Sequence, residues 1–208
     1  MRISELLLRT LISIESRLSV LASRIPEYSF SGDWVSHAAP IWSEQLGQFK
    51  GRERVHLLEI GSHEGRSAKW FLDNILTHQT SSITCVDTFP HKVLESRFDH
   101  NIRNTGRASK VLKIKGDSKE VLKLLRRDNY DIVYIDGSHA AADVYSDARL
   151  SWELLKKDGV IIFDDYAWQP ELPPEELPAP GIDRFLEEAR PDIELLHKGY
   201  QVIIKRIR

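Results

Sequence analysis

The chain has 208 residues, of which 41% are hydrophobic and 29% are charged, a balance typical of one globular domain with an appendage. A net charge of -2 gives no support for a nucleic-acid partner, because such proteins usually carry a basic excess. Cys85 is the only cysteine, which excludes an internal disulfide and a cysteine-based zinc site and favours a cytoplasmic setting. No apolar run reaches the roughly 18 residues that cross a bilayer, so no integral membrane segment is expected.

Residues 3–23 carry apolar side chains at helical spacing and are predicted to form an amphipathic helix. The stripe consists of Leu7, Leu11, Ile14, Leu18 and Leu21. We expect this helix to pack on the domain, on a second copy of the chain as a homodimer contact, or on a membrane surface.

Aromatic residues are dense between residues 26 and 49, where a helix is predicted from about residue 34 to 46. These aromatic side chains could lie over a ligand opening or anchor the segment to the core, and the sequence leaves both alternatives open. We therefore assign residues 1–50 to an N-terminal helical extension or cap and residues 51–208 to the main domain.

A glycine-containing turn follows the first predicted strand, residues 55–60, and precedes a helix predicted over residues 66–76. The turn reads Glu59-Ile60-Gly61-Ser62-His63-Glu64-Gly65. Glycine serves where a strand turns sharply into a helix and where a ligand must touch the backbone. An ordinary turn would also explain the glycines. The pattern differs from the three-glycine dinucleotide motif, because His63 stands where the second glycine is expected.

Acidic residues follow the next two predicted strands, residues 83–86 and 111–115. Asp87 could accept the two hydroxyls of a ribose, or could serve only as a turn or helix-cap residue. Asp117 and Glu120 have the spacing of a capping box before a helix predicted over residues 119–126. Because Asp117 also lies at the end of a strand, a contact with the base of a nucleoside ligand is the alternative.

Residues 130–168 are predicted to form a strand–helix–strand unit, with strands at 132–135 and 160–163 and a helix at about 140–156. Lys156, Lys157 and Gly159 fit the end of that helix. Such crossovers are right-handed and join parallel strands, so the residues that follow the two strands should converge at one edge of the sheet. These residues are Asp136, His139, Asp164 and Asp165.

Five prolines between residues 168 and 181 predict a stiff loop without helix or central strand, either beside the ligand opening or as a plain surface excursion. A last helix is predicted over residues 182–189, and strands over 193–196 and 201–207 form a hairpin. The predicted fold is α/β: a Rossmann-like, mostly parallel seven-stranded sheet with helices on both faces and a C-terminal antiparallel hairpin, plus the N-terminal extension.

Five motifs in this order resemble the class I S-adenosylmethionine-dependent methyltransferases: LLEIGSHEGRSAKWFL, ITCVDTF, GDS, YDIVYIDGSH and GVIIFDDYAW. Within that class, IDGSH followed by FDDY is most similar to the small-molecule and sugar O-methyltransferases, which include macrolide-sugar and cephalosporin-type enzymes. The resemblance implies S-adenosylmethionine as cofactor. The methionine part would be held by Glu59, Gly61, Ser62 and Gly65, the ribose by Asp87, and the adenine by Asp117 and Ser118, with Asp136 also at the cofactor.

The same resemblance implies Mg²⁺ bound by Asp136, Asp164 and Asp165, with His139 as the base. This agrees with the chemistry, because converging carboxylates repel one another unless a hard cation lies between them. Bound Mg²⁺ would lower the pKa of an acceptor hydroxyl, and His139 would take its proton with Asp136 nearby. The predicted function is O-methylation of a small molecule or sugar.

Two other functions stay open from the sequence. Gly61, Gly65 and Asp87 could serve a nicotinamide-dependent oxidoreductase, although the third glycine is missing and the acidic edge would repel a second phosphate. A non-catalytic protein that binds a cofactor or a partner is the other alternative, although converging carboxylates are costly to keep for packing alone.

Overall fold

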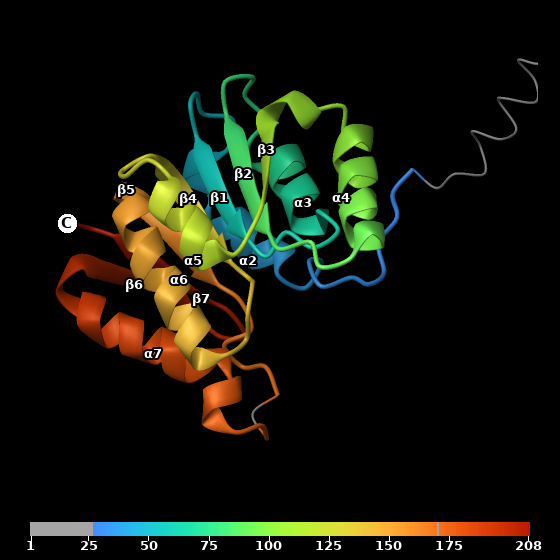
Figure 1. Ribbon diagram of the computed structural model, residues 1–208. Helices are drawn as coiled ribbons and strands as arrows, with labels where there is room; N and C mark the ends of the chain where they lie inside the picture. The colour runs from blue at the N-terminus through green and yellow to red at the C-terminus, as the bar shows by residue number, and fades with distance from the viewer. Residues whose placement is uncertain (1–26, 170) are drawn as a thin grey trace, which may run out of the picture.

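The computed structural model describes residues 27–169 and 171–208, so the predicted helix over residues 3–23 and its role in a homodimer lie outside the described residues. Seven strands form one sheet in the order β3-β2-β1-β4-β5-β7-β6 (Figure 1). Their bounds are β1 (His56–Ile60), β2 (Ser82–Asp87), β3 (Val111–Lys115), β4 (Tyr130–Ile135), β5 (Leu155–Phe163), β6 (Ile193–Lys198) and β7 (Val202–Arg206). Strands β1 to β5 are parallel, and β7 pairs antiparallel with both β5 and β6. The predicted Rossmann-like fold is confirmed.

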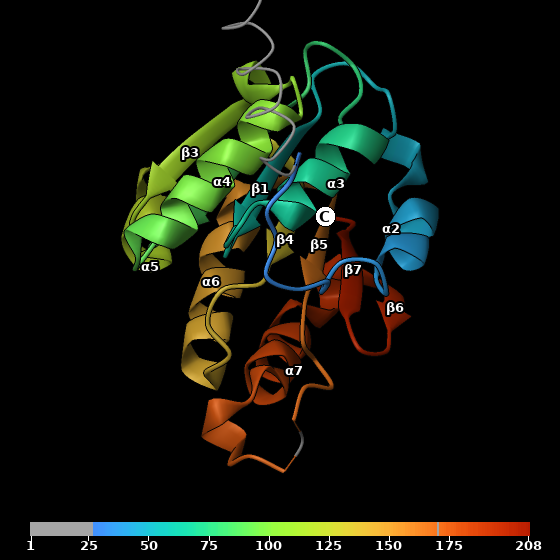
Figure 2. The same ribbon diagram turned by 90° about the vertical axis from the view of Figure 1, so that its right-hand side faces the viewer.

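Within residues 27–169 and 171–208, six α-helices cover the sheet: α2 (Ala39–Gln45), α3 (Arg66–Asn74), α4 (Lys92–Asn104), α5 (Ser118–Val121), α6 (Ala141–Leu154) and α7 (Pro178–Ala189). Short 3-10 helices occupy Gly47–Phe49, Ala108–Lys110, Leu122–Leu124, Pro174–Glu176 and Arg190–Asp192. Successive strand residues point to opposite faces, and the buried side chains accordingly form two clusters. One cluster packs against α2, α3 and α4, and the other against α5, α6 and α7 (Figures 1 and 2).

The strand register brings the ends of four parallel strands to one level. Ile60 pairs with both Val86 and Ile135, and Ile135 pairs with Phe163. The residues that directly follow these positions therefore lie along one edge, as predicted. They are Gly61, Asp87, Asp136 and Asp164.

The aromatic segment before β1 contributes to the core. Trp42 is fully buried, its ring packs against Phe71 and Tyr134, and its Nε1 donates a hydrogen bond to Gln201 Oε1 at 2.7 Å. Val35, Ala38, Leu46 and Phe49 belong to the same cluster. Trp34, in contrast, is 59% exposed. Trp42 therefore anchors the segment to the core, whereas the Trp34 ring lies at the surface, edge-on to His63 with ring centroids 5.5 Å apart. A separate unit over residues 1–50 stays a prediction.

The helix predicted over residues 140–156 was placed too far toward the C-terminus. Helix α6 ends at Leu154, and β5 begins at Leu155, which is fully buried and pairs with Tyr130. Lys156 and Lys157 are therefore strand residues, and Lys156 Nζ contacts Asp131 at 2.8 Å. Gly159 also lies inside the strand rather than at a helix end.

Helix α7 corrects the proline-based prediction. It begins at Pro178, within the segment where the prolines were expected to prevent a helix. Pro178 and Pro180 lie in its first turn, where no backbone N–H is needed for an intrahelical hydrogen bond. An added Cβ on Gly181 would lie 2.1 Å from the carbonyl oxygen of Ala141, so this glycine lets α7 approach α6 closely.

Three other helices differ from the sequence analysis. Helix α2 starts at Ala39 rather than near residue 34, and α5 is a single turn continued by the 3-10 helix to Leu124. Helix α4 was not predicted. Only Phe98, Asn101 and Ile102 of its 13 residues are buried, so its apolar periodicity is weak.

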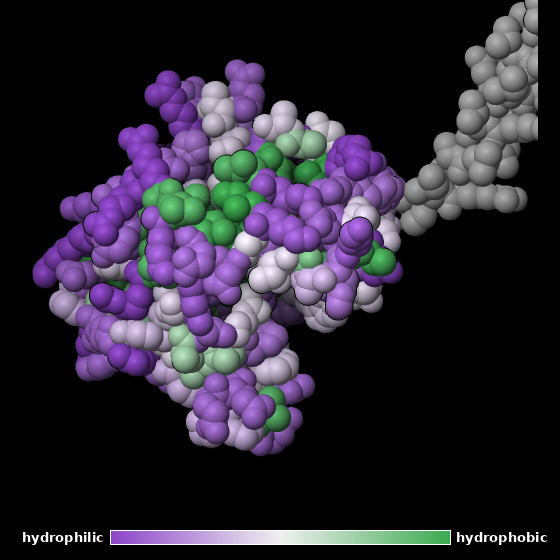
Figure 3. All heavy atoms as spheres, viewed as in Figure 1, coloured by the Kyte–Doolittle hydropathy of each residue, from purple (hydrophilic) through white to green (hydrophobic). Residues whose placement is uncertain are grey.

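The surface is mostly hydrophilic, with an apolar area over β3 and the segment after α5 (Figure 3). Leu112 and Leu124, the exposed large apolar residues of these elements, are 56% and 85% exposed. Strand β3 is an edge of the sheet, and Lys113 and Lys115 place charges along it, a common protection against edge-to-edge pairing. In the described part of the chain, none of the helices combines the length and the apolar character needed to span a membrane.

Asp147 provides a pH test of the packing between α5 and α6. It is buried, it accepts a hydrogen bond from Ser118 Oγ at 2.7 Å, and burial raises its pKa from 3.8 to about 6. Since the folded state binds this proton more tightly than the unfolded state, the stabilisation is present below about pH 4 and is lost as the pH rises through 6. Asp147→Asn should therefore gain stability relative to wild type as the pH rises, by up to about 3 kcal/mol.

Chemical denaturation between pH 4 and pH 8 measures this difference. The control is Asp158→Asn, which removes an exposed carboxylate and its ion pair with Lys205 and should not gain stability over wild type. A free-energy difference between wild type and Asp147→Asn that is constant over this range would contradict the assignment.

Candidate active site

The glycine turn between β1 and α3 is fixed by a close approach of two strand ends. Gly61 has a φ of +87°, and an added Cβ would lie 1.9 Å from the backbone oxygen of Asp136. Gly65 has a φ of +77° and precedes the first residue of α3. His63 has a φ of +45° without being glycine, so the position that departs from the glycine pattern still takes the left-handed conformation. The turn therefore requires glycine at position 61.

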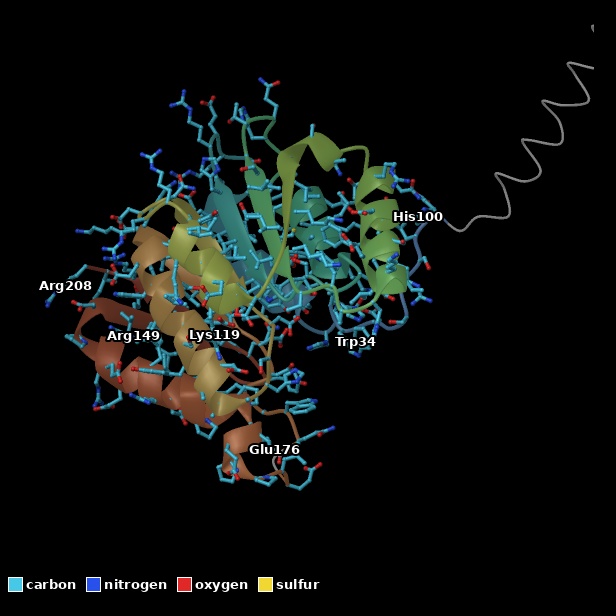
Figure 4. All side chains as sticks on the ribbon, in the orientation of Figure 1. Trp34, His100, Lys119, Arg149, Glu176 and Arg208 are labelled. Atoms are coloured by element: carbon cyan, nitrogen blue, oxygen red, sulfur yellow. The ribbon has the colours of Figure 1, made fainter. Side chains whose placement is uncertain are left out.

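A first cavity of about 360 Å³ lies against this turn and is called the cofactor cavity below. Five predicted ligand-binding residues line it: Gly61, Asp87, Asp117, Ser118 and Asp136. Its remaining lining residues are Ile60, His63, Val86, Thr88, Gly116, Lys119, Gly137, Ser138 and Asp143. Lys119, one of these lining residues, is labelled in Figure 4 and belongs to α5.

The other three predicted cofactor residues do not line this cavity. Glu59 is fully buried and accepts a hydrogen bond from Ser67 Oγ at 2.6 Å, and burial raises its pKa. Ser62 is buried and lines a smaller hollow of about 40 Å³. Gly65 faces Phe98, which an added Cβ would approach to 3.0 Å. These three residues of the turn therefore lie outside the wall of the cofactor cavity.

Asp87 and Asp117 have structural roles as well as positions at the cavity. The two carboxylate oxygens of Asp87 accept hydrogen bonds from the backbone N–H groups of His63 and Phe89, at 2.8 and 2.6 Å. Asp117 caps α5 by accepting from the backbone N–H of Lys119 at 2.8 Å. Glu120 contacts Lys123 at 3.0 Å instead of completing the capping box.

A second cavity of about 350 Å³ adjoins the first and is called the acceptor cavity. Gly61, His63, Asp136 and Gly137 line both cavities. The rest of its wall consists of Trp34, His37, His139, Asp164, Asp165, Trp168 and Tyr200. All four predicted edge residues, Asp136, His139, Asp164 and Asp165, therefore come together here. Figure 4 labels Trp34, which projects from the segment before α2.

His139 and Asp165 form a hydrogen-bonded pair in this wall. His139 Nε2 lies 2.8 Å from Asp165 Oδ2, and its ring stacks on Trp168 with centroids 4.2 Å apart. Tyr200 donates to Asp165 Oδ1 at 2.7 Å. The bond to Asp165 raises the pKa of His139. Burial alone would raise the pKa of Asp165, but the bonds from His139 and Tyr200 outweigh it and lower this pKa. Asp165 is thus the ionised partner.

Asp136 and Asp164 share one hydrogen-bond partner, the hydroxyl of Tyr134. The Tyr134 hydroxyl lies 2.9 Å from Asp136 Oδ2 and is also hydrogen-bonded to Asp164 Oδ2. Burial and the nearby Asp164 and Asp165 raise the pKa of Asp136 well above its usual value. Burial and Asp165 likewise raise the pKa of Asp164. The acidic edge is therefore divided between one paired carboxylate and two carboxyl groups that resist ionisation.

The candidate metal site of the structure contains His139 in place of the predicted Asp164. One ligand atom from each of Asp136, His139 and Asp165 lies within 4.8 Å of the other two. Asp164 is turned inward instead: one oxygen contacts Tyr134 and the other accepts from the backbone N–H of Asp165 at 2.7 Å. A carboxylate–imidazole set can hold a divalent cation. The trio of Asp136, Asp164 and Asp165 stays a prediction.

Sequence reasoning did not identify Tyr134 and Tyr200 as site residues. Tyr134 is an apolar-strand residue in the pattern of β4, and only its hydroxyl reaches the edge. Tyr200 lies in the hairpin turn, 35 residues from Asp165. An aromatic residue directly before a predicted strand gives no signal for such a contact.

Comparison with known proteins gives the family and the fold. A family model described as a methyltransferase domain matches residues 58–166, which are 109 of the 208 residues. An uncharacterized protein of Acanthamoeba polyphaga mimivirus is 28% identical over 141 residues, which cover 63% of this chain and 62% of that protein. The match thus spans less than two thirds of that relative.

Several solved structures have the same fold at 15–20% identity. An O-methyltransferase from Bacillus cereus in complex with SAH has a TM-score of 0.64 and 18% identity, covering 93% of this chain and 90% of that one. TomG from Streptomyces achromogenes, an O-methyltransferase of tomaymycin synthesis in complex with SAM, has a TM-score of 0.66 and 15% identity, covering 88% and 84%. MycE of the mycinamycin pathway, in complex with Mg, SAH and mycinamycin VI, has a TM-score of 0.64 and 20% identity, covering 92% and 54%.

The family match covers the glycine turn, all residues of the cofactor cavity and the acidic edge. The chain therefore belongs to the methyltransferase-domain family.

Proposed function

We propose that this protein transfers the methyl group of S-adenosylmethionine to a hydroxyl group of a small molecule or sugar. The observation that carries the proposal is the junction of the two cavities at Gly61, His63, Asp136 and Gly137. A methyl donor in the first cavity and an acceptor in the second would meet at this shared wall. Proximity of the two reactants is the main requirement, because the sulfonium of the cofactor carries its own leaving group.

The residues of the cofactor cavity fit the proposed cofactor. Asp87 retains free lone pairs after its two backbone contacts and could accept ribose hydroxyls. Asp117 and Ser118 lie at the start of α5, on the rim where the adenine would bind. Glu59, Ser62 and Gly65 would act by shaping the turn that faces the methionine part.

A hydroxyl acceptor must lose a proton, and the paired His139 and Asp165 are placed to take it. The arrangement of an imidazole oriented by a carboxylate is the one that activates hydroxyl nucleophiles in other enzymes. Asp165 would orient the ring through Nε2, and stacking on Trp168 would hold its plane. We therefore assign the role of general base to His139 and an electrostatic role to Asp136.

Mg²⁺ at the same edge is a second candidate for acceptor activation. The clustered ligand atoms of Asp136, His139 and Asp165 support it, and Asp164 could join after turning away from Tyr134. A divalent cation would reverse the repulsion that raises the pKa of Asp136 and would supply Lewis-acid activation of the acceptor. MycE, with which this chain shares the fold, was crystallised with Mg.

The two rival functions have less support. A nicotinamide dinucleotide would have to place its second half along the acidic wall formed by Asp136, Asp164 and Asp165, which would repel its phosphate. A purely binding protein would have no need of an imidazole held by Asp165 at the junction of two cavities.

Calorimetric titration tests the cofactor directly. We expect wild type to bind S-adenosylmethionine and not NAD(H). Asp87→Asn should weaken the cofactor affinity about tenfold or more, because a charge-assisted hydrogen bond is worth about 1.5–3 kcal/mol. Asp158→Asn, at the opposite end of the sheet, is the matched control. Binding of NAD(H) without S-adenosylmethionine would overturn the proposal.

His139→Gln tests the base. Turnover, measured as S-adenosylhomocysteine formation with a panel of sugar, catechol and phenol acceptors, should fall by about 10²–10⁴-fold because general base catalysis contributes that much. The dissociation constant for S-adenosylmethionine should stay within about twofold of wild type. His197→Gln in β6 is the control and should leave turnover unchanged. Full turnover in His139→Gln would remove His139 from the mechanism.

Metal removal separates the two modes of activation. If Mg²⁺ binds, calorimetry on chelator-treated protein with S-adenosylmethionine should detect one site, and Asp165→Asn should weaken its Mg²⁺ affinity at least about tenfold because a ligand is lost. Asp158→Asn should bind Mg²⁺ like wild type. The absence of Mg²⁺ binding in wild type would rule out the metal and leave the pair of His139 and Asp165 as the activating groups.

A further inference from the structure

Tyr134 is a buried residue of the core whose polar end reaches the acidic edge. It is 1% exposed, and its ring packs edge-on against Trp42 and Phe71, with centroids 5.1 and 5.6 Å away. Because these two rings are themselves fully buried, the direction of the phenol is fixed by the core. The hydroxyl is therefore presented to the edge in one position.

That hydroxyl contacts two carboxyl groups from different strands. Asp136 Oδ2, directly after β4, lies 2.9 Å away, and Asp164 Oδ2, directly after β5, is also a hydrogen-bond partner. A phenol has one hydrogen to donate, so the Asp136 and Asp164 carboxyl groups are linked through a single group. Without it, the buried Asp164 and the partly buried Asp136 would face each other with no donor between them, which is costly.

The two carboxyl groups differ in what they face. Asp136 lines both cavities, whereas Asp164 lines the acceptor cavity only and also accepts from the backbone N–H of Asp165. The orientation of the Asp136 carboxyl group therefore shapes the walls of both cavities and the cluster of ligand atoms with His139 and Asp165. A fixed donor behind this carboxyl group would hold its second oxygen toward the cavities.

We infer that Tyr134 is the positioning residue of the active site: its hydroxyl holds the Asp136 carboxyl group toward the junction of the two cavities and keeps Asp164 turned inward. The inference rests on the proposed function for its catalytic meaning. The held geometry itself is independent of which acceptor or metal binds. Tyr134 does not face the cavities and acts only through the two acids.

Tyr134→Phe removes the hydroxyl and keeps the ring, and Tyr130→Phe is a matched control on the same strand. Tyr130 is also buried, and its hydroxyl donates to Thr84 Oγ1 at 3.3 Å, away from the edge. Tyr130→Phe loses one hydrogen bond and Tyr134→Phe loses two, so both variants should lower the unfolding temperature. Only Tyr134→Phe should rotate the Asp136 carboxyl group in its crystal structure and weaken S-adenosylmethionine affinity several-fold. If Mg²⁺ binds, its affinity should fall about 10–100-fold, as for other residues that orient metal ligands.

Unchanged Asp136 and Asp164 carboxyl groups in the Tyr134→Phe crystal structure, with cofactor affinity within twofold of wild type, would overturn the inference and leave Tyr134 a core residue. Failure of wild type to bind S-adenosylmethionine would instead overturn the proposed function, and the crystal structure would still decide on Tyr134. If Tyr134→Phe does not fold, the double variant Tyr134→Phe with Asp164→Asn removes one of the facing charges. The double variant is compared with Asp164→Asn alone. It should show the rotation of Asp136 and the loss of affinity that are expected for Tyr134→Phe. If the double variant and Asp164→Asn behave alike, the inference is contradicted.

Discussion

The site depends on the contact between Gly61 and the backbone of Asp136. Strands β1 and β4 are neighbours in the sheet, and the chain can turn out of both at the same level only because position 61 has no side chain. Through this contact, the glycine turn and Asp136 form parts of one wall. Since that wall belongs to both cavities, the two cavities join at this contact. A larger residue at position 61 would separate the strand ends and with them the two cavities.

The charges at the acidic edge are compensated in two different ways. Asp165 has an imidazole and a phenol as partners, which keep it ionised, whereas Asp136 and Asp164 share the single hydroxyl of Tyr134 and have raised pKa values. No Lys or Arg is among the described residues that line the acceptor cavity. The cationic group of this wall is His139, whose pKa is raised by its hydrogen bond to Asp165. The aromatic residues of the wall, Trp34, Trp168 and Tyr200, offer flat surfaces for a ring.

Sequence patterns were sufficient for the fold and for the position of the edge, because an apolar run that ends in acid is a direct signature of a buried parallel strand followed by its polar end. Asp87, Asp136 and Asp164 were found in this way, and each directly follows or ends its strand. The patterns failed where tertiary contacts decide. Leu155 continues the helical stripe of α6 yet is a strand residue, because it is taken up in the pairing with Tyr130. Pro178 and Pro180 open a helix instead of preventing one. The inward orientation of Asp164 depends on its contact with Tyr134 of the neighbouring strand. Asp165 likewise contacts Tyr200, which lies 35 residues away in the chain. The spacing of residues along the sequence does not reveal such contacts.

The residues of the two cavities come from different parts of the chain, and this difference bears on specificity for the acceptor. All residues of the cofactor cavity, from Ile60 to Asp143, lie within the part matched by the methyltransferase family, residues 58–166. Trp34, His37, Trp168 and Tyr200 of the acceptor cavity lie outside it. Trp34 and His37 come from the segment that Trp42 anchors through its hydrogen bond to Gln201, which directly follows Tyr200. The rings of His37 and Tyr200 are in contact, with centroids 5.3 Å apart. The segments before and after the matched region thus meet at the acceptor cavity and supply these four residues to its wall. Under the proposed function, the choice of acceptor would therefore depend on segments that the family model does not cover, while the match itself covers the cofactor cavity.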